Sequence, residues 1–311
     1  MSRLRPALIL ACIFAVTLFA FVGAPARSAH AAGGIGDLFV TSDASNVVRA
    51  YTGSTGSYLG IFTSSALGVG QLAIHFGATN NRVLVGHFGG GVDEFDAASG
   101  AYIKTYAPGG GFQWAGLYAP NGNVIIGSQN TNDLRVYDPN TGAFLYVLTP
   151  FPGAADMTIG PNGNLYVCSY TNYMVAEIDP VGGAILSSWS QPFGDRTNDI
   201  AFLPGGNILV TVMSSNVCYV YDPAYNLINT FAGTGWARPH GVAISPYSGR
   251  ILIVDGVTTQ VHEFDPITFA ETNAAFLTPN PGDKIVDLAF RPLQATPARS
   301  TSWGRIKALW R

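Results

Sequence analysis

The chain has 311 residues, of which 48% are hydrophobic and only 11% are charged, with 37 glycines and 19 prolines. This length suits one large domain or two smaller ones, and the composition favours short strands and tight turns over long solvated helices. Residues 32–291 carry 9 basic and 19 acidic side chains, a net charge of −10. An acidic body argues against nucleic-acid binding, which needs a basic face to neutralise phosphates.

The first 31 residues have the pattern of a secretory signal peptide. Arg3 and Arg5 precede an apolar run over residues 6–22, and small residues in Ala29–Ala31 predict cleavage after Ala31. We therefore expect the protein to be secreted, periplasmic or held at the cell envelope. The alternatives are an uncleaved anchor and a lipoprotein site at Cys12, which the position of this cysteine ahead of most of the apolar run disfavours.

Two markers recur along the chain with a period near 42 residues. An aspartate after an aromatic or aliphatic residue recurs at spacings of 42, 41, 43 and 43, at Asp96, Asp138, Asp179, Asp222 and Asp265. A proline recurs at spacings of 41, 43, 42 and 46, at Pro120, Pro161, Pro204, Pro246 and Pro292. A shared period of this length, with several strand-like runs per unit, is typical of β-propeller blades.

Each repeat predicts four strands joined by tight turns. In one unit we expect strands near 114–119, 123–128, 133–138 and 143–148. Asn121-Gly122 suits the hairpin between the first two strands, and Asn-Thr-Gly at 140–142 suits the turn before the fourth strand, because its glycine adopts positive φ easily.

Five complete units begin near Gly70, Trp114, Ala155, Asn198 and His240. A sixth is divided between the ends of the repeat region: residues 37–63 supply its last three strands, and residues 285–291 supply its first strand. The sequence therefore predicts an all-β, six-bladed propeller of four-stranded blades over residues 32–292, with the first blade closed by N- and C-terminal strands. Closure in this way leaves no free sheet edge at the seam.

The repeat units, such as PHGVAISPYSGRILIVDGVTTQVHEFDP at residues 239–266, resemble NHL repeats. They are also similar to YVTN, gluconolactonase-like and virginiamycin B lyase-like propellers, over residues 35–292. These folds include lyases, lactonases, esterases and binding modules, so the resemblance implies the fold and leaves the activity to be argued from a site.

The residues that open the inner strands form the candidate site, because inner strands run along the propeller axis and begin at the same end. We expect them to surround one mouth of the channel, where three carboxylates, an amide and an imidazole suit Ca²⁺ or another cation. The metal candidates are Asp156, Asn198, Asp199 and Asp287; the ligand-binding candidates are Trp114, Asn198 and His240, and His240 is also the catalytic candidate. The alternative for each aspartate is a structural one, in which it accepts hydrogen bonds from loop N–H groups.

The resemblance to gluconolactonase and paraoxonase propellers implies a channel Ca²⁺ held by acidic and asparagine side chains. The glutamate that those families also use has no counterpart in this ring, which counts against their activity here. Virginiamycin B lyase-like propellers use histidines near the axis, and only His240 meets that expectation. His75 ends its strand, away from the expected mouth, and His87 and His262 fit packed or solvated positions.

Two further features leave alternatives open. Cys168 and Cys218 remain after signal-peptide cleavage and are either paired or, as we favour, free and buried. The tail, 293–311, carries four basic residues and no acid. Its Trp303, Ile306 and Trp310 have helical spacing, which suits envelope attachment, docking on the acidic propeller, or a frayed end.

The sequence as a whole favours a secreted, monomeric binding module without catalysis. Its ligand is expected to be a protein, a glycan or a small molecule, with no cofactor other than Ca²⁺. The alternative is a metal-dependent lactonase- or esterase-type hydrolase, or a lyase, with its site at the channel mouth.

Overall fold

The computed structural model describes residues 32–64, 70–107 and 113–292. The chain divides into two units, 1–30 and 31–311, and the described residues all belong to the second. The signal peptide and the basic tail predicted from the sequence lie outside the described residues. Within those residues, no helix is long and apolar enough to cross a membrane.

In the part of the chain that the structure describes, 24 strands form six four-stranded antiparallel blades, as the repeat predicts. The inner strands are β24 (Ile285–Phe290), β4 (Gln71–Phe76), β8 (Gln113–Tyr118), β12 (Ala154–Ile159), β16 (Thr197–Phe202) and β20 (Pro239–Ile244). The second strands are β1 (Leu38–Ser42), β5 (Arg82–His87), β9 (Val124–Ser128), β13 (Leu165–Ser169), β17 (Ile208–Val212) and β21 (Ile251–Asp255). The third strands are β2 (Val47–Tyr51), β6 (Val92–Asp96), β10 (Asp133–Tyr137), β14 (Met174–Ile178), β18 (Val217–Tyr221) and β22 (Val261–Phe264). The outer strands are β3 (Tyr58–Ser64), β7 (Tyr102–Tyr106), β11 (Phe144–Pro150), β15 (Ile185–Ser190), β19 (Leu227–Phe231) and β23 (Glu271–Asn273).

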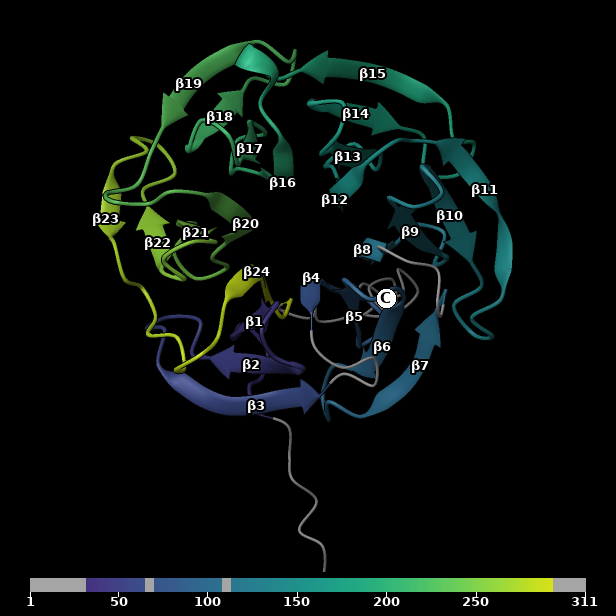
Figure 1. Ribbon diagram of the computed structural model, residues 1–311, viewed down its shortest axis with the longest axis horizontal. Coiled ribbons are helices and arrows are strands. Elements are labelled where there is room, and N and C mark those ends of the chain that lie inside the picture. The colour runs from purple at the N-terminus through teal and green to yellow at the C-terminus, as the bar shows by residue number, and fades with distance from the viewer. Residues whose placement is uncertain (1–31, 65–69, 108–112, 293–311) are drawn as a thin grey trace, which may run out of the picture. The chain divides into compact units, whose positions relative to one another are not determined.

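The six inner strands contact one another in sequence around a central channel, and the ring is closed by the contact of β24 with β4 (Figure 1). Blades are numbered from 1, which contains β24 and β1–β3, to 6, which contains β20–β23. One bridge, between His87 and Gln113, joins the sheets of blades 2 and 3. A 3₁₀ turn, Pro192–Gly194, precedes blade 5.

The predicted seam is confirmed. Strand β24 pairs antiparallel with β1, with Phe290 opposite Leu38 and Leu288 opposite Val40. In Figure 1 the C-terminal yellow strand completes the N-terminal purple blade. Strand β1 is then paired on both sides, by β24 and by β2, and this pairing ties together the two ends of the described chain.

The aspartate that recurs in each repeat stabilises the turn before the outer strand. Asp138 Oδ1 accepts hydrogen bonds of 2.8 Å from the backbone N–H groups of both Asn140 and Thr141, and Gly142 has the predicted positive φ of 74°. Asp96, Asp179, Asp222 and Asp265 bind nearby N–H groups in the same way. The recurring aspartate therefore marks a turn that is repeated along the chain, in which its carboxylate accepts hydrogen bonds from backbone N–H groups.

The core lies between blades and consists of apolar side chains from alternating strand positions. Leu134, Val136 and Met157, for example, are buried in one cluster shared by neighbouring blades. Cys168 and Cys218 are both free and buried, as the sequence favoured. Each blade thus buries its two faces against its neighbours, and the channel at the axis is left to the inner strands.

Candidate functional site in the central channel

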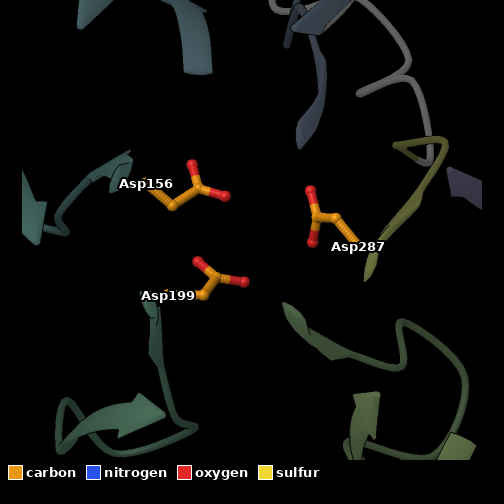
Figure 2. Close-up of side chains that lie close together, drawn as sticks. All are labelled: Asp156, Asp199 and Asp287. Carbon is orange, nitrogen blue, oxygen red and sulfur yellow. The ribbon is translucent and has the colours of Figure 1, made fainter. Parts of the chain in front are cut away.

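Three aspartates occupy the same position, the third residue, in three inner strands. They are Asp156 in β12, Asp199 in β16 and Asp287 in β24. The pairing of each inner strand with its neighbour shifts register next to this position, the mark of a β-bulge. A bulge bends the strand and redirects a side chain, and here the carboxylates turn towards the axis (Figure 2).

The three carboxylates form one buried cluster. One oxygen from each lies within 4.8 Å of the others, and the residues are only 3–5% exposed. Figure 2 shows the three groups pointing toward one another from different blades. Two oxygens on opposite sides of a calcium ion with bonds of about 2.4 Å would be about 4.8 Å apart, so this separation suits a single bound Ca²⁺.

The carboxylates also link neighbouring blades. Asp199 Oδ2 accepts a hydrogen bond of 2.6 Å from the N–H of Val242 in blade 6. Asp287 Oδ2 accepts one of 2.8 Å from the N–H of Ile74 in blade 2. Asp199 and Asp287 therefore have a structural role besides their convergence on the axis, but their donors are N–H groups of neighbouring inner strands and not the loop N–H groups expected from the sequence.

Burial and mutual repulsion disfavour three negative charges in this cluster. The pKa values of Asp199 and Asp287 are raised well above the ordinary range, first by burial and then by the charge of Asp156. Burial opposes a charge on His75, but Asp156 and Asp287 outweigh it and raise the imidazole pKa. Burial and mutual repulsion therefore favour the binding of protons, or of a cation, by the cluster.

A cavity of about 330 Å³ extends along the axis from the three aspartates. Its walls include His75, Thr158 and Ala201, and it reaches the last residues of the inner strands at Ile159, Phe202, Ile244 and Phe290. We expected the aspartates to surround a mouth at the start of the inner strands. The cavity instead runs from them towards the ends of the inner strands.

The structure separates the remaining candidates from this cavity. Asn198 Nδ2 lies 3.1 Å from His240 Nδ1, and both side chains are buried outside the cavity lining. Burial, followed by the charge of Arg238, lowers the pKa of His240 to about 4, so its imidazole is neutral near pH 7. Trp114 packs on Tyr170, with ring centroids 5.6 Å apart, and does not line the cavity.

His75 is the residue that our reading of the sequence missed. We placed it away from the mouth, yet its Nε2 lies 2.6 Å from Asp156 Oδ1 and its side chain lines the cavity. The sequence does contain a signal for His75. It lies two residues after Ala73, and Ala73 is the third residue of β4, the position that the aspartates occupy in their own strands. Residues two apart in a strand face the same side, so His75 also faces the axis.

Comparisons with known proteins define the class of protein as a β-propeller. No protein-family model and no curated protein sequence matches the chain. Among solved structures, a protein of unknown function from Bacteroides caccae aligns with a TM-score of 0.62 and 14% identity, covering 81% of this chain and 97% of that one. The prediction of a β-propeller fold is confirmed.

Two further similar structures have named functions. A catalytically inactive histidine-to-alanine variant of virginiamycin B lyase from Staphylococcus aureus, with quinupristin, aligns with a TM-score of 0.57 and 15% identity over 70% of this chain and 73% of that one. A nidogen/laminin complex aligns with a TM-score of 0.68 and 13% identity over 82% of this chain and 99% of that one. At these identities the likeness shows the fold alone, and function rests on the channel residues.

Proposed function

We propose that this propeller is a secreted binding module whose central channel binds a divalent cation, with Ca²⁺ as the best match. The observation that carries the proposal is the convergence of Asp156, Asp199 and Asp287, from three blades, on a single buried point at the inner end of an open cavity. Oxygen ligands in a flexible arrangement favour hard cations, and Ca²⁺ is the one that tolerates irregular geometry best.

The cation would serve as a fixed positive charge for a ligand that enters the cavity. Between the aspartates and the apolar residues Phe202 and Phe290 there is room for a small group bearing an oxygen donor. Similarity in fold to a nidogen/laminin complex is compatible with a binding role for this scaffold. We propose a monomeric module on this basis, with a protein, glycan or small molecule as the ligand class.

The direct test is metal analysis of the purified mature protein, followed by calorimetric titration of the chelator-treated protein with Ca²⁺, Mg²⁺ and Zn²⁺. We expect one equivalent of Ca²⁺ to bind, and the chelator-treated protein to gain thermal stability when Ca²⁺ is restored. Absence of any metal-dependent change with all three ions would make the aspartates blade-linking residues only.

Catalysis is a second candidate, favoured by the pair of His75 and Asp156. The His75 side chain is 23% exposed in the cavity wall, and a carboxylate 2.6 Å from one ring nitrogen orients the imidazole and raises its basicity. A cation-dependent lyase or hydrolase would use this imidazole as a general base. Hydrolysis of p-nitrophenyl acetate in the presence of Ca²⁺, compared between wild type and His75→Gln, tests this: equal rates would remove the support for catalysis.

Export from the cytoplasm is part of the proposal and rests on the sequence of residues 1–31. We expect N-terminal sequencing of the exported protein to begin at Ala32 or within a few residues of it. An exported protein that still begins at Met1 would contradict the signal peptide.

A further inference from the structure

A second cavity, of about 680 Å³, opens beside the channel between blades 2, 3 and 4. Its walls are the hairpins that join the first two strands of these blades, at 78–80, 119–122 and 160–163. Ile159 lines both this hairpin cavity and the channel cavity, so the two are neighbours. The volume is in the range of small-molecule sites, roughly 300–1,000 Å³.

Arg82 lies in the wall of the hairpin cavity with most of its donors unused. Its side chain is 38% exposed, and its ion pair within the described residues is a long one, 4.0 Å from Nε to Glu94 Oε1. The guanidinium makes no hydrogen bond to any described residue. Asp96 faces Arg82 across the β5–β6 ladder, but its Oδ1 is already bound by the N–H groups of Ala98 and Ser99.

Glu94 does not need Arg82, because other groups hold its carboxylate. Glu94 Oε1 accepts a hydrogen bond of 2.6 Å from the Tyr118 hydroxyl, and Oε2 accepts one of 3.1 Å from the Tyr106 hydroxyl. Lys104 Nζ lies 3.5 Å from Oε2 and supplies the compensating positive charge. The guanidinium of Arg82 is therefore available to a ligand. Its two parallel N–H groups match the two oxygens of a planar carboxylate.

The rest of the cavity wall combines the polar residues Thr79, Asn80 and Asn140 with an apolar part that includes three prolines. They are Pro120, Pro139 and Pro161, joined by Ala78, Ala119 and Ile159. Proline rings present flat apolar faces, which favour a flat apolar body in the ligand. The nearby carboxylates of Glu94 and Asp96 disfavour a dianion, so the guanidinium of Arg82 suits a single carboxylate better than a phosphate.

We propose that the hairpin cavity binds a small monocarboxylate with a flat apolar body, and that Arg82 holds its carboxylate. This site is separate from the channel cation and does not depend on it. The occupied cavity would lie next to the channel opening across Ile159.

Benzoate is the simplest probe, with benzyl alcohol as its uncharged counterpart. Binding to the full mature protein is measured by ligand-observed NMR titration, with and without Ca²⁺. We expect benzoate to bind at millimolar concentration or better, benzyl alcohol to bind more weakly, and Ca²⁺ to leave both unchanged. Loss of the charged hydrogen bonds in Arg82→Gln should weaken benzoate binding roughly tenfold or more.

Arg250→Gln is the matched control. Arg250 immediately precedes β21, as Arg82 begins β5, and it pairs at 4.0 Å with Asp265, but it does not line the hairpin cavity. The Arg250→Gln variant should bind benzoate like the wild type. Arg82→Lys keeps the positive charge but lacks the paired N–H groups of the guanidinium, so it should bind benzoate more weakly. Wild-type benzoate affinity in both Arg82 variants, or no benzoate binding to the wild type, would overturn the proposal. Failure of Ca²⁺ binding in the channel would leave this result unaffected.

Discussion

His75 Nε2 lies 2.6 Å from Asp156 Oδ1, although the two residues are 81 positions apart and belong to blades 2 and 4. The contact crosses the channel wall past blade 3, whose inner strand β8 has Ala115 at the position that holds aspartates elsewhere. The pair places a basic side chain against the aspartate cluster, and the neighbouring carboxylates raise the pKa of that imidazole.

Asp287→Asn is the substitution that should remove cation binding with the least damage to the fold. Asp287 Oδ2 accepts the Ile74 N–H, a bond that an asparagine carbonyl can preserve, whereas both oxygens of Asp199 already accept backbone N–H groups. We expect saturating Ca²⁺ to raise the melting temperature of the wild type and to have little effect on Asp287→Asn.

The control for this variant is Asp179→Asn, which removes a charge from an exposed turn of blade 4. It should show the wild-type response to Ca²⁺. A Ca²⁺ response that is equally large in Asp287→Asn would place the cation elsewhere.

The metal-free protein should lose stability as the pH rises. The pKa values of Asp199, Asp287 and His75 are raised in the folded state, so each group binds its proton more tightly there than in the unfolded chain. Their contribution is complete below the unfolded pKa values and is lost as the pH passes through the folded ones. Denaturant melts from pH 4 to 9 in chelator should show this fall, and Ca²⁺ should reverse it at high pH.

His240 acts in the opposite direction. Its folded pKa of about 4 lies below the ordinary value of 6.5, so stability is lost as the pH falls from 6.5 towards 4. The full effect is roughly 3 kcal/mol for this buried group. Comparing wild type with Asp287→Asn at each pH cancels the His240 contribution. If the two proteins have parallel pH profiles without metal, Asp287 titrates normally and the cluster is not strained by its charge.

Gly241 should resist substitution because it occupies the aspartate position in blade 6. A Cβ added there would lie 2.6 Å from the Cα of Asp287 and would also meet its carboxylate. We expect Gly241→Ala to destabilise the fold by about 1–3 kcal/mol, the usual cost of overpacking, and to weaken Ca²⁺ binding.

Gly89→Ala is its control, since a Cβ at Gly89 meets nothing within 4 Å. Chemical denaturation and calcium titration of both variants measure the two effects. Equal stability of both proteins would mean that blade 6 moves away from the cluster at little cost.

Removing β24 should abolish cooperative folding. A chain that ends at Asp283 leaves β1 without its inner partner and opens the ring between β20 and β4, both of which β24 contacts. A chain that ends at Pro292 keeps β24 and should melt like the full-length protein in calorimetry. A cooperative, unchanged melt after the first truncation would show that the seam is dispensable.

The same Pro292 truncation tests the tail. If residues 293–311 attach the protein to the envelope, the truncated protein should move from the envelope fraction to the medium, with its melting temperature intact. Loss of about 1 kcal/mol or more of stability would instead support docking of the tail on the propeller.

The blade repeat could be predicted from sequence because its determinants are local. The Asp138 turn binds N–H groups two and three residues away, and Gly142 sets the backbone of that turn by itself. Such interactions recur at each repeat and leave a period in the sequence, which also revealed the unpaired inner strand at residues 285–291. The three aspartates were found for the same reason, since they occupy one position of the repeat.

The arrangement of the channel side chains, by contrast, depends on contacts between blades. The direction in which Asp156 faces comes from a bulge, and a bulge is a mismatch between two strands that neither strand's own sequence displays. The pairing of His75 with Asp156 needs the closed ring, and so does the burial of Asn198 and His240 away from the cavity. Repetition along the chain determined the fold, whereas ring closure decided which side chains meet at the axis, because those distances exist only once six blades surround it.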